Sequence, residues 1–392
     1  MFAVLHKARK SLTALAATAG LIALAACQPI QTAGGGGPSI DPRAPVAVAL
    51  LVPGGSGQAT DALVARSVEN AARLAISDLG DVRIDLRVYS TAGQPAQAAA
   101  LAQRAVDEGA RIILGPVFAQ EANAAGLAVA ARGVNVLSLS NNPDIAGGNV
   151  FVLGNTFEST ANRLADYAAR QGKRRIMIVH EQNTVGEIGR TTIERAVSRS
   201  GATVVGTGSY AFSQTDIVQA IPGIAAAARS AGADAVFFTA DTAGALPLVT
   251  QLLMENGIPP ATTQYIGLTR WDIPQATLGL PGVQGGWFAL PDPVLNERFQ
   301  ARYAAAFGEP PHITAAPAYD GIAAIGALIK AGRSDALSRA ALTQGAGFVG
   351  VGGIFRLRGD GTNERGLAVA QIRNNQVVVI DPAPKSFGGA GF

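Results

Sequence analysis

The sequence predicts an α/β protein made of two consecutive lobes with parallel-rich sheets. Short apolar runs alternate along the chain with longer segments whose apolar residues recur at helical spacing. Repeated strand–helix units of this kind form a parallel sheet with helices on both faces. A break at 143–156, which contains Pro143 and three glycines, divides the pattern into two series of similar size. Two such series indicate two lobes with a cleft between them.

The first series begins with a continuous apolar run at 46–52, which is long enough for a buried strand and too short for a helix. Its further strands are expected at 82–88, 111–114 and 134–137, and its helices at 61–79, 95–108 and 120–132. Apolar and polar residues alternate in 82–88, so this strand is expected nearer a sheet edge.

The second series continues the same alternation. Its helices are expected at 158–171, 188–200, 217–230 and 243–256, and its strands at 176–179, 203–205, 235–238 and 264–267. The last third is less uniform: it predicts a strand at 287–290, helices at 294–307 and 318–331, and antiparallel strands at 353–357, 367–373 and 377–380. Asp360-Gly361 and Asn374-Asn375 supply turns between these last strands.

Composition excludes several other classes of protein. Of the 392 residues, 48% are apolar, so the chain can bury a sizeable core and is not disordered throughout. After residue 26 no apolar run approaches the ~20 residues that cross a bilayer. The 47 glycines have no three-residue period and there is no sustained heptad, which excludes collagen and coiled coil.

Residues 1–26 have the pattern of an export signal. Lys7, Arg9 and Lys10 precede an uncharged run at 12–26 that is too short to span a membrane. The run ends in Leu-Ala-Ala before Cys27, the only cysteine of the chain. This resembles the bacterial lipobox, in which the cysteine is acylated; the alternative is an ordinary signal peptide beside a chance cysteine. Gln28 rather than Asp follows Cys27, which by analogy with enterobacterial sorting favours the outer membrane.

Removal of the signal also removes the excess positive charge. The signal contains three of the 31 basic residues and no acidic one, so 28 basic residues remain against 28 acidic ones. No basic field is left for nucleic acid, so no nucleic-acid partner is expected. Residues 27–43 are rich in glycine, proline and polar residues, and we expect them to form a flexible tether. The glycine- and proline-rich end at 385–392 is expected to fray.

The sequence carries few signs of reactive chemistry. The turn 54–57 (GGSG) occupies the place of a dinucleotide-binding glycine turn. However, the second strand does not end in an acidic residue that could bind a ribose. A small-ligand loop or a tight turn is therefore favoured. His180-Glu181 suits an acid/base pair, although a polar loop residue pair is the commoner case. No cluster has metal-ligand spacing and no G-x-S-x-G occurs. We therefore expect no enzyme, no cofactor and no metal.

Several segments together resemble a known family. They are 46–53 (VAVALLVP), 70–75 (NAARLA), 113–118 (ILGPVF), 136–141 (VLSLSN), 147–151 (GGNVF) and 316–320 (APAYD). In this order and spacing they resemble the type I periplasmic binding proteins of the leucine-binding superfamily. Within it, the chain is most similar to penicillin-binding protein activators, the LppC-type lipoproteins. The resemblance covers residues 45 to about 382.

The resemblance implies a specific architecture. Two Rossmann-like lobes would be joined by three crossovers, expected near residues 156, 284 and 333. The first lobe would then comprise 44–156 with 285–333, and the second lobe 157–284 with 334–384. The lobes would close on a ligand like a hinge.

The resemblance also implies candidate ligand-cleft residues, which lie in loops at the carboxyl ends of strands, where parallel sheets place ligands. For the first lobe these are Gly115, Phe118, Gln120, Ser138, Ser140 and Asn141, together with Ser56 in the glycine turn; for the second lobe they are Asn183, Thr239 and Asp241. Amino-acid binders have small hydroxyl residues after the third strand, whereas this chain has Phe118-Ala119-Gln120-Glu121. Glu121 near the helix N-terminus would repel a ligand carboxylate and satisfy the helix dipole itself.

Three functions follow as hypotheses. The first is a non-enzymatic lipoprotein, anchored through Cys27, that activates a penicillin-binding protein and so regulates peptidoglycan synthesis. The second is a substrate-binding lipoprotein that delivers an amino acid or similar small solute to an ABC permease. The third, a sensor ectodomain, lacks a signalling element that crosses the membrane.

Overall fold

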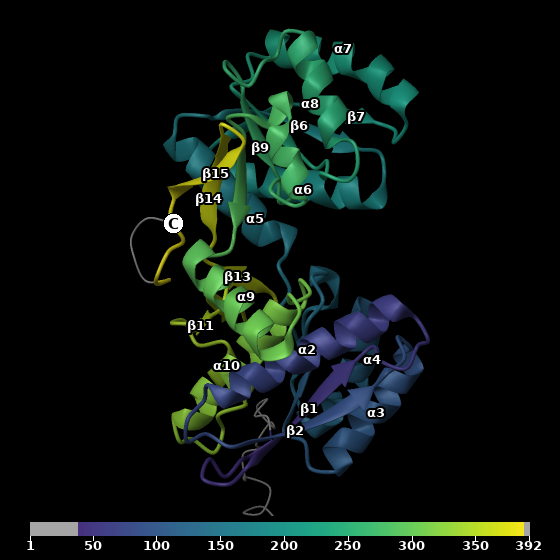
Figure 1. Cartoon of the computed structure of the whole chain (residues 1–392), viewed down its shortest axis with the longest axis vertical. Coiled ribbons are helices and arrows are strands. Elements are labelled where there is room, and N and C mark those ends of the chain that lie inside the picture. The colour runs from purple at the N-terminus through teal and green to yellow at the C-terminus, as the bar shows by residue number, and fades with distance from the viewer. Residues whose placement is uncertain (1–37, 388–392) are drawn as a thin grey trace, which may run out of the picture. The chain divides into compact units, whose positions relative to one another are not determined.

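The computed structural model describes residues 38–387, so the expected signal, the greater part of the tether including Cys27, and residues 388–392 lie outside the described part. The architecture is α/β with three sheets (Figure 1). Among residues 38–387 no helix has the length and apolar character needed to cross a bilayer.

The first sheet has five parallel strands in the order β2-β1-β3-β4-β5. They are β1 (Val46–Val52), β2 (Ile84–Ser90), β3 (Ile112–Leu114), β4 (Val136–Ser138) and β5 (Val150–Val152). The helices between them are α2 (Ala59–Ser77), α3 (Pro95–Asp107) and α4 (Ala119–Val129). β5 falls inside the stretch that the sequence reads as a break, because three residues are too few to show a period.

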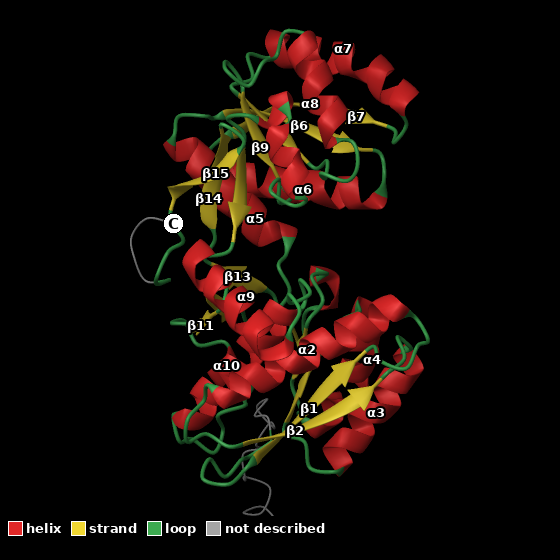
Figure 2. Cartoon of the chain, viewed as in Figure 1, coloured by secondary structure: helices red, strands yellow, loops and turns green. Residues whose placement is uncertain are grey.

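Helices cover both faces of this sheet because successive side chains of β1 point to opposite faces. Val48 and Leu50 pack in a core with α2 and with α9 (Pro293–Phe307) and α10 (Ala315–Lys330), which come from the last third of the chain. Ala49 and Leu51 pack on the other side with α3 and α4. Figure 2 shows helices flanking the strands of this sheet. The uniformly apolar run at 46–52 is thus explained by burial on both faces.

The second sheet has seven strands in the order β15-β14-β10-β9-β8-β6-β7. They are β6 (Arg175–Glu181), β7 (Thr203–Tyr210), β8 (Ala235–Phe238), β9 (Gln264–Gly267), β10 (Trp287–Leu290), β14 (Ala368–Arg373) and β15 (Gln376–Asp381). The five strands from β7 to β10 are parallel, and β14 and β15 are antiparallel additions. α5 (Phe157–Arg170) and α6 (Thr184–Arg199) cover one face, and α7 (Gln214–Ser230) and α8 (Leu246–Glu255) cover the other.

A small antiparallel sheet completes the fold. It consists of β11 (Phe348–Gly350), β12 (Gly353–Leu357) and β13 (Asn363–Arg365), and the short helix α11 (Arg339–Leu342) precedes it. Phe348, Phe355 and Leu357 belong to the same core as β1 and α10. Single turns of 3₁₀ helix lie at Ala130–Arg132, Pro143–Ile145, Gln275–Gly279 and Pro281–Val283.

The chain crosses between the two lobes three times, as expected. The crossings lie between β5 and α5, between β10 and α9, and between β13 and β14. The lobe boundaries expected at 284 and 333 differ from this arrangement. Residues 287–290 pair with β9 and β14 in the second sheet, and 348–365 pack in the core of the first lobe. We propose boundaries at the observed crossings, because strand pairing and shared cores define the two lobes.

A buried ion pair lies where these crossings meet. The Arg365 guanidinium is 2.7 Å from a carboxylate oxygen of Asp320 on α10, and the two side chains are 7% and 1% exposed. Asp320 also accepts a hydrogen bond of 2.8 Å from the Val351 N–H. Arg365 donates further to the carbonyl of Leu153, in the first crossing. One cation therefore connects β13, α10 and the first crossing.

We predict that Asp320→Ala lowers the free energy of unfolding by about 3–5 kcal/mol, because it leaves the buried Arg365 charge without its partner. Urea denaturation followed by circular dichroism measures the effect. The matched control is Glu309→Ala, which breaks the exposed ion pair with Arg66 (2.8 Å) and is expected to cost about 1 kcal/mol or less. Equal losses in the two variants would contradict the prediction.

Candidate functional site

The carboxyl ends of the strands in the first lobe carry the predicted residues of the turns after β1 and β3. Gly115 is buried at φ +84°, and a Cβ there would come within 2.2 Å of the Leu51 carbonyl oxygen, so glycine is required by backbone packing. The Ser56 hydroxyl accepts the N–H of Gln58 at 3.1 Å. Phe118 and Gln120 are exposed at the start of α4. Of these four residues, Phe118 and Gln120 are the most exposed, Ser56 is half-buried and Gly115 is buried.

The loop after β4 uses its hydroxyl groups internally. Ser138 donates to the Pro116 carbonyl at 3.2 Å and accepts the Ser140 N–H at 3.1 Å. The Ser140 hydroxyl accepts the N–H of Asn142 at 3.1 Å, and both serines are buried. Asn141 is exposed. The two serines therefore fix the loop, and Asn141 is the residue that the loop presents.

Asn141 lines a pocket of about 450 Å³ formed by residues of both lobes, which we call the interlobe pocket. The loop after β4 and Thr362 form one side, and helices α5 and α6 form the other. Its wall includes Asn141, Asp144, Phe157, Glu158, Val185, Ile188, Thr192, Arg195, Arg199 and Thr362. Its volume lies in the range of small-molecule sites.

Sequence reasoning missed the α6 wall of this pocket. The residues 185, 188, 192, 195 and 199 recur at spacings of three and four, which places them on one face of the helix. Val185 and Ile188, the apolar residues at the start of this face, are 59% and 42% exposed, so the rest of the protein does not cover them. Arg199 pairs with Glu158 at 3.2 Å, whereas Arg195 has no side-chain partner within residues 38–387. This spacing is a signal that the sequence already contained.

The second lobe gathers hydrogen-bond acceptors at the ends of β6, β7 and β8. Glu181 and Tyr210 are register partners at the ends of β6 and β7, and the Thr239 hydroxyl accepts the Glu181 N–H at 3.4 Å. Asp241 follows in the loop after β8 and is exposed. We call Glu181, Tyr210 and Asp241 the acidic cluster.

The two carboxyl groups of the acidic cluster influence each other. Desolvation raises the pKa of Glu181, and the negative charge of Asp241 raises it further, while the Asn183 amide opposes the shift. Burial and both carboxylates raise the pKa of the Tyr210 hydroxyl. That hydroxyl is buried and has no hydrogen-bond partner in the described part of the chain. A ligand that donates hydrogen bonds or carries a positive charge would pair with the two carboxylates.

Asn183 has a structural task beside the acidic cluster. Its side-chain oxygen accepts the Gly186 N–H at 2.7 Å and so caps α6, and its amide donates to the Glu181 carboxylate. His180 is buried, and its Nδ1 lies 3.1 Å from the Glu181 backbone oxygen, so the two side chains do not form an acid/base pair. No group of three or more metal-ligating side chains occurs among residues 38–387.

Glu121 lies in the first turn of α4, as the sequence indicates, but its side chain is buried. Neither carboxylate oxygen makes a hydrogen bond of good geometry within residues 38–387. Desolvation is the main cause that raises the pKa of Glu121, and the negative charge of Asp61 raises it further. The Thr91 hydroxyl and the Phe118 N–H lower this pKa in part. The ionised form of Glu121 is therefore disfavoured in the folded protein.

We predict that Glu121→Gln raises the thermal midpoint at pH 7. A raised folded-state pKa means that ionisation of Glu121 destabilises the native state above that pKa. The gain from the substitution should shrink as the pH falls through the folded-state pKa and vanish near the ordinary value of about 4.3. Thermal melts between pH 4 and 8 measure it. Glu297→Gln, at an exposed position of α9, is the control; a gain for Glu121→Gln that does not depend on pH would argue against the prediction.

Comparison with known proteins agrees with this architecture. Residues 45–376 match the family described as "Periplasmic binding protein". A putative branched-chain amino acid ABC transporter protein from Rhodospirillum rubrum is 20% identical, with a TM-score of 0.73, over 86% of this chain and 100% of that chain. A branched-chain amino acid ABC transporter periplasmic ligand-binding protein from Burkholderia xenovorans is 18% identical, with a TM-score of 0.67, over 88% of this chain and 97% of that one.

A third structure, an ABC transporter substrate-binding protein from Desulfitobacterium hafniense in complex with leucine, is 18% identical, with a TM-score of 0.62, over 86% of this chain and 100% of that chain. No curated protein matches the sequence. At these identities the three structures establish the fold. None of the three is described as a regulator of peptidoglycan synthesis, so the expected penicillin-binding protein partner has no support from them.

Proposed function

Because the chain belongs to the periplasmic binding protein family, we propose that it is the substrate-binding component of an ABC transporter. It binds a small solute between its lobes and delivers it to a permease. The observation that carries this proposal is the interlobe pocket of about 450 Å³, to which both lobes contribute side chains. A ligand that contacts both lobes favours the arrangement that brings them together, which is how a receptor of this kind signals occupancy.

The solute of this proposal carries a protonated amine that binds the acidic cluster, whose residues do not themselves line the interlobe pocket. Glu181 and Asp241 are two carboxylates whose interaction is unfavourable when both are ionised, and the Tyr210 hydroxyl beside them has no partner in the described residues. A cation between the two carboxylates would relieve their repulsion and donate hydrogen bonds to both. The carboxylate of an α-amino acid, next to its amine, would be repelled by the same two carboxylates. Amines without a carboxylate therefore fit better than α-amino acids.

The proposal includes a lipid anchor at Cys27, carried over from the lipobox-like sequence. Attachment would hold the receptor at a membrane surface through the tether. The outer membrane remains the expected location from the residue after the cysteine. Mass spectrometry of the N-terminal peptide from membrane fractions checks the acylation.

We predict that agmatine, putrescine or a related diamine raises the thermal midpoint of the purified protein, and that leucine raises it less. A ligand at 100 times its Kd adds about 2.7 kcal/mol of stability. Asp241→Asn and Glu181→Gln should abolish the shift because each removes one counter-charge of the cation. Differential scanning fluorimetry is the measurement.

The control variant is Glu255→Gln, at an exposed position of α8 in the same lobe. It should leave the shift unchanged. A larger shift with leucine than with any amine, which persists in Asp241→Asn, would refute the amine class while leaving solute binding intact. The absence of any shift with amines, amino acids and other small solutes would refute the transport role itself.

A further inference from the structure

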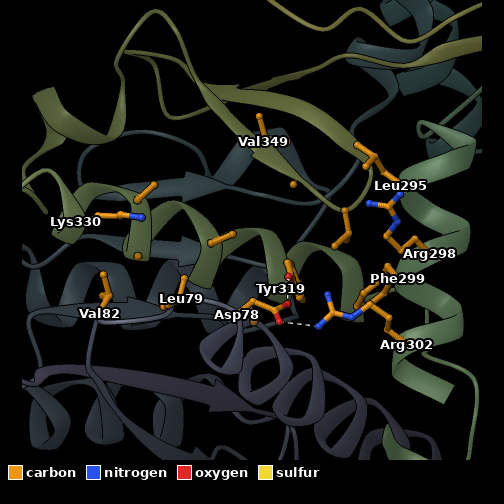
Figure 3. A pocket seen from close by; sticks show the side chains of 16 residues that line it. Asp78, Leu79, Val82, Leu295, Arg298, Phe299, Arg302, Tyr319, Lys330 and Val349 are labelled. Carbon is orange, nitrogen blue, oxygen red and sulfur yellow. Dashed lines mark hydrogen bonds and ion pairs between the residues drawn. The ribbon is translucent and has the colours of Figure 1, made fainter. Parts of the chain in front are cut away.

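A second cavity, of about 370 Å³, lies entirely within the first lobe. It is bounded by the end of α2, by α9 and α10, and by β11, and we call it the α2–α10 groove (Figure 3). α2 begins after the carboxyl end of β1, whereas the groove lies at its other end, where Ala75, Asp78 and Leu79 line it. None of the residues that line the interlobe pocket lines this groove. It is thus a separate site.

The floor and one wall of the groove are apolar. Leu79 packs against α10 so closely that a Cβ on Gly326 would come within 2.4 Å of the Leu79 Cδ2 atom. Phe299 of α9 adds an aromatic side, and Val349 of β11 is 68% exposed. β11 is an edge strand of its sheet, so Val349 has no further strand beyond it within the described residues. The groove therefore offers an apolar surface to a body that fits beside α10.

The polar groups of the groove carry an excess of positive charge. Asp78 pairs with Arg302 at 2.6 Å and also accepts a hydrogen bond from the Tyr319 hydroxyl. These donors, Arg302 first, lower the pKa of Asp78, so this carboxylate stays ionised and is already used. Two further cations, Arg298 and Lys330, line the groove without any side-chain partner within residues 38–387. The lining as a whole thus carries two unmatched positive charges.

Figure 3 shows Arg298, Phe299 and Arg302 on α9 at one side of the groove and Lys330 on α10 at its other end. Lys330 is the last residue of α10, where a cation is favourable because of the helix dipole. That reason does not apply to Arg298, which lies in the middle of α9. Arg298 is exposed, so its guanidinium is accessible to a ligand in the groove.

We propose that the α2–α10 groove is a binding site for a small organic anion with an apolar body, such as a medium-chain or aromatic carboxylate. The carboxylate binds the planar guanidinium of Arg298, which matches its geometry in a two-pronged hydrogen bond. The apolar body lies along Leu79 and Val349, and Lys330 adds a long-range attraction. A volume of about 370 Å³ is sufficient for a ligand of this size.

Isothermal titration of the purified full-length protein with octanoate tests the proposal, with 1-octanol and octylamine as neutral and cationic probes of the same chain length. We expect saturable binding of octanoate and weaker or no binding of the other two. Arg298→Ala should weaken octanoate binding by about tenfold or more, because a charge-assisted hydrogen bond is lost. Lys330→Ala should weaken it less, and Arg298→Lys should restore part of the loss.

Two further variants locate the bound anion. Ala327→Glu places a negative charge at an exposed position of the groove lining and should abolish binding. Arg111→Ala removes an exposed cation of the first lobe that does not line the groove and should change nothing. Circular dichroism melts confirm that all variants are folded.

The proposal is overturned if octanoate shows no saturable binding, or if Arg298→Ala and Ala327→Glu bind it as the unaltered protein does. Loss of binding in Arg195→Ala, which alters the interlobe pocket, with binding retained in Arg298→Ala, would place the anion in that pocket and would equally overturn the proposal.

Discussion

The connection between the two lobes depends on the small sheet β11-β12-β13, because all three chain crossings are hydrogen-bonded to it or to its neighbours. The Asn363 amide donates to the carbonyls of Val152 and Gly154 in the first crossing, at 2.9 and 2.8 Å. In the second crossing the Asp292 N–H donates to the Gly352 carbonyl at 2.8 Å, and in the third the Gly366 N–H donates to the Ile354 carbonyl at 2.8 Å. The buried ion pair of Arg365 and Asp320 lies at the same junction. Its desolvation is costly, so the pair depends on the further hydrogen bonds that Asp320 accepts from Val351 and Arg365 donates to Leu153.

The α/β class was predictable because parallel strands buried on both faces appear in the sequence as short apolar runs, which the 46–52 segment shows most clearly. Strands that depend on packing were not. The sequence predicts a strand at 203–205, but β7 continues to Tyr210 through Gly206 and Gly208. Glycine has no strand preference, so the sequence does not predict a strand here. Glycine is needed at both positions because a Cβ would come within 2.8 Å of a core side chain, Met177 for Gly206 and Ile224 for Gly208. The lobe boundaries expected at 284 and 333 differ from the proposed ones for the same reason, since β10 and β11 pack with partners far away in the sequence.

Of the cleft residues predicted from the sequence, only Asn141 lines the interlobe pocket. The loops that the sequence singled out do lie at the carboxyl ends of strands, since that follows from the parallel topology. Which side chains are available there does not follow from topology. Ser138 and Ser140 are used within their loop and Asn183 caps α6, while Val185 and Ile188 are exposed on a helix face that a loop-based search does not consider. Short polar side chains after a strand form hydrogen bonds with the nearby backbone as readily as with a ligand.

The arrangement of the two proposed sites has a consequence for how their occupancy is transmitted. The interlobe pocket takes side chains from both lobes, so its ligand has a different affinity for different lobe arrangements and can shift their balance. The α2–α10 groove is lined only by residues of the first lobe, so its ligand would make no contact that differs between arrangements of the two lobes. A ligand without differential affinity shifts no equilibrium, however tightly it binds. An anion in the groove would therefore change the charge and surface that the first lobe presents, while a solute between the lobes changes the arrangement of the lobes themselves.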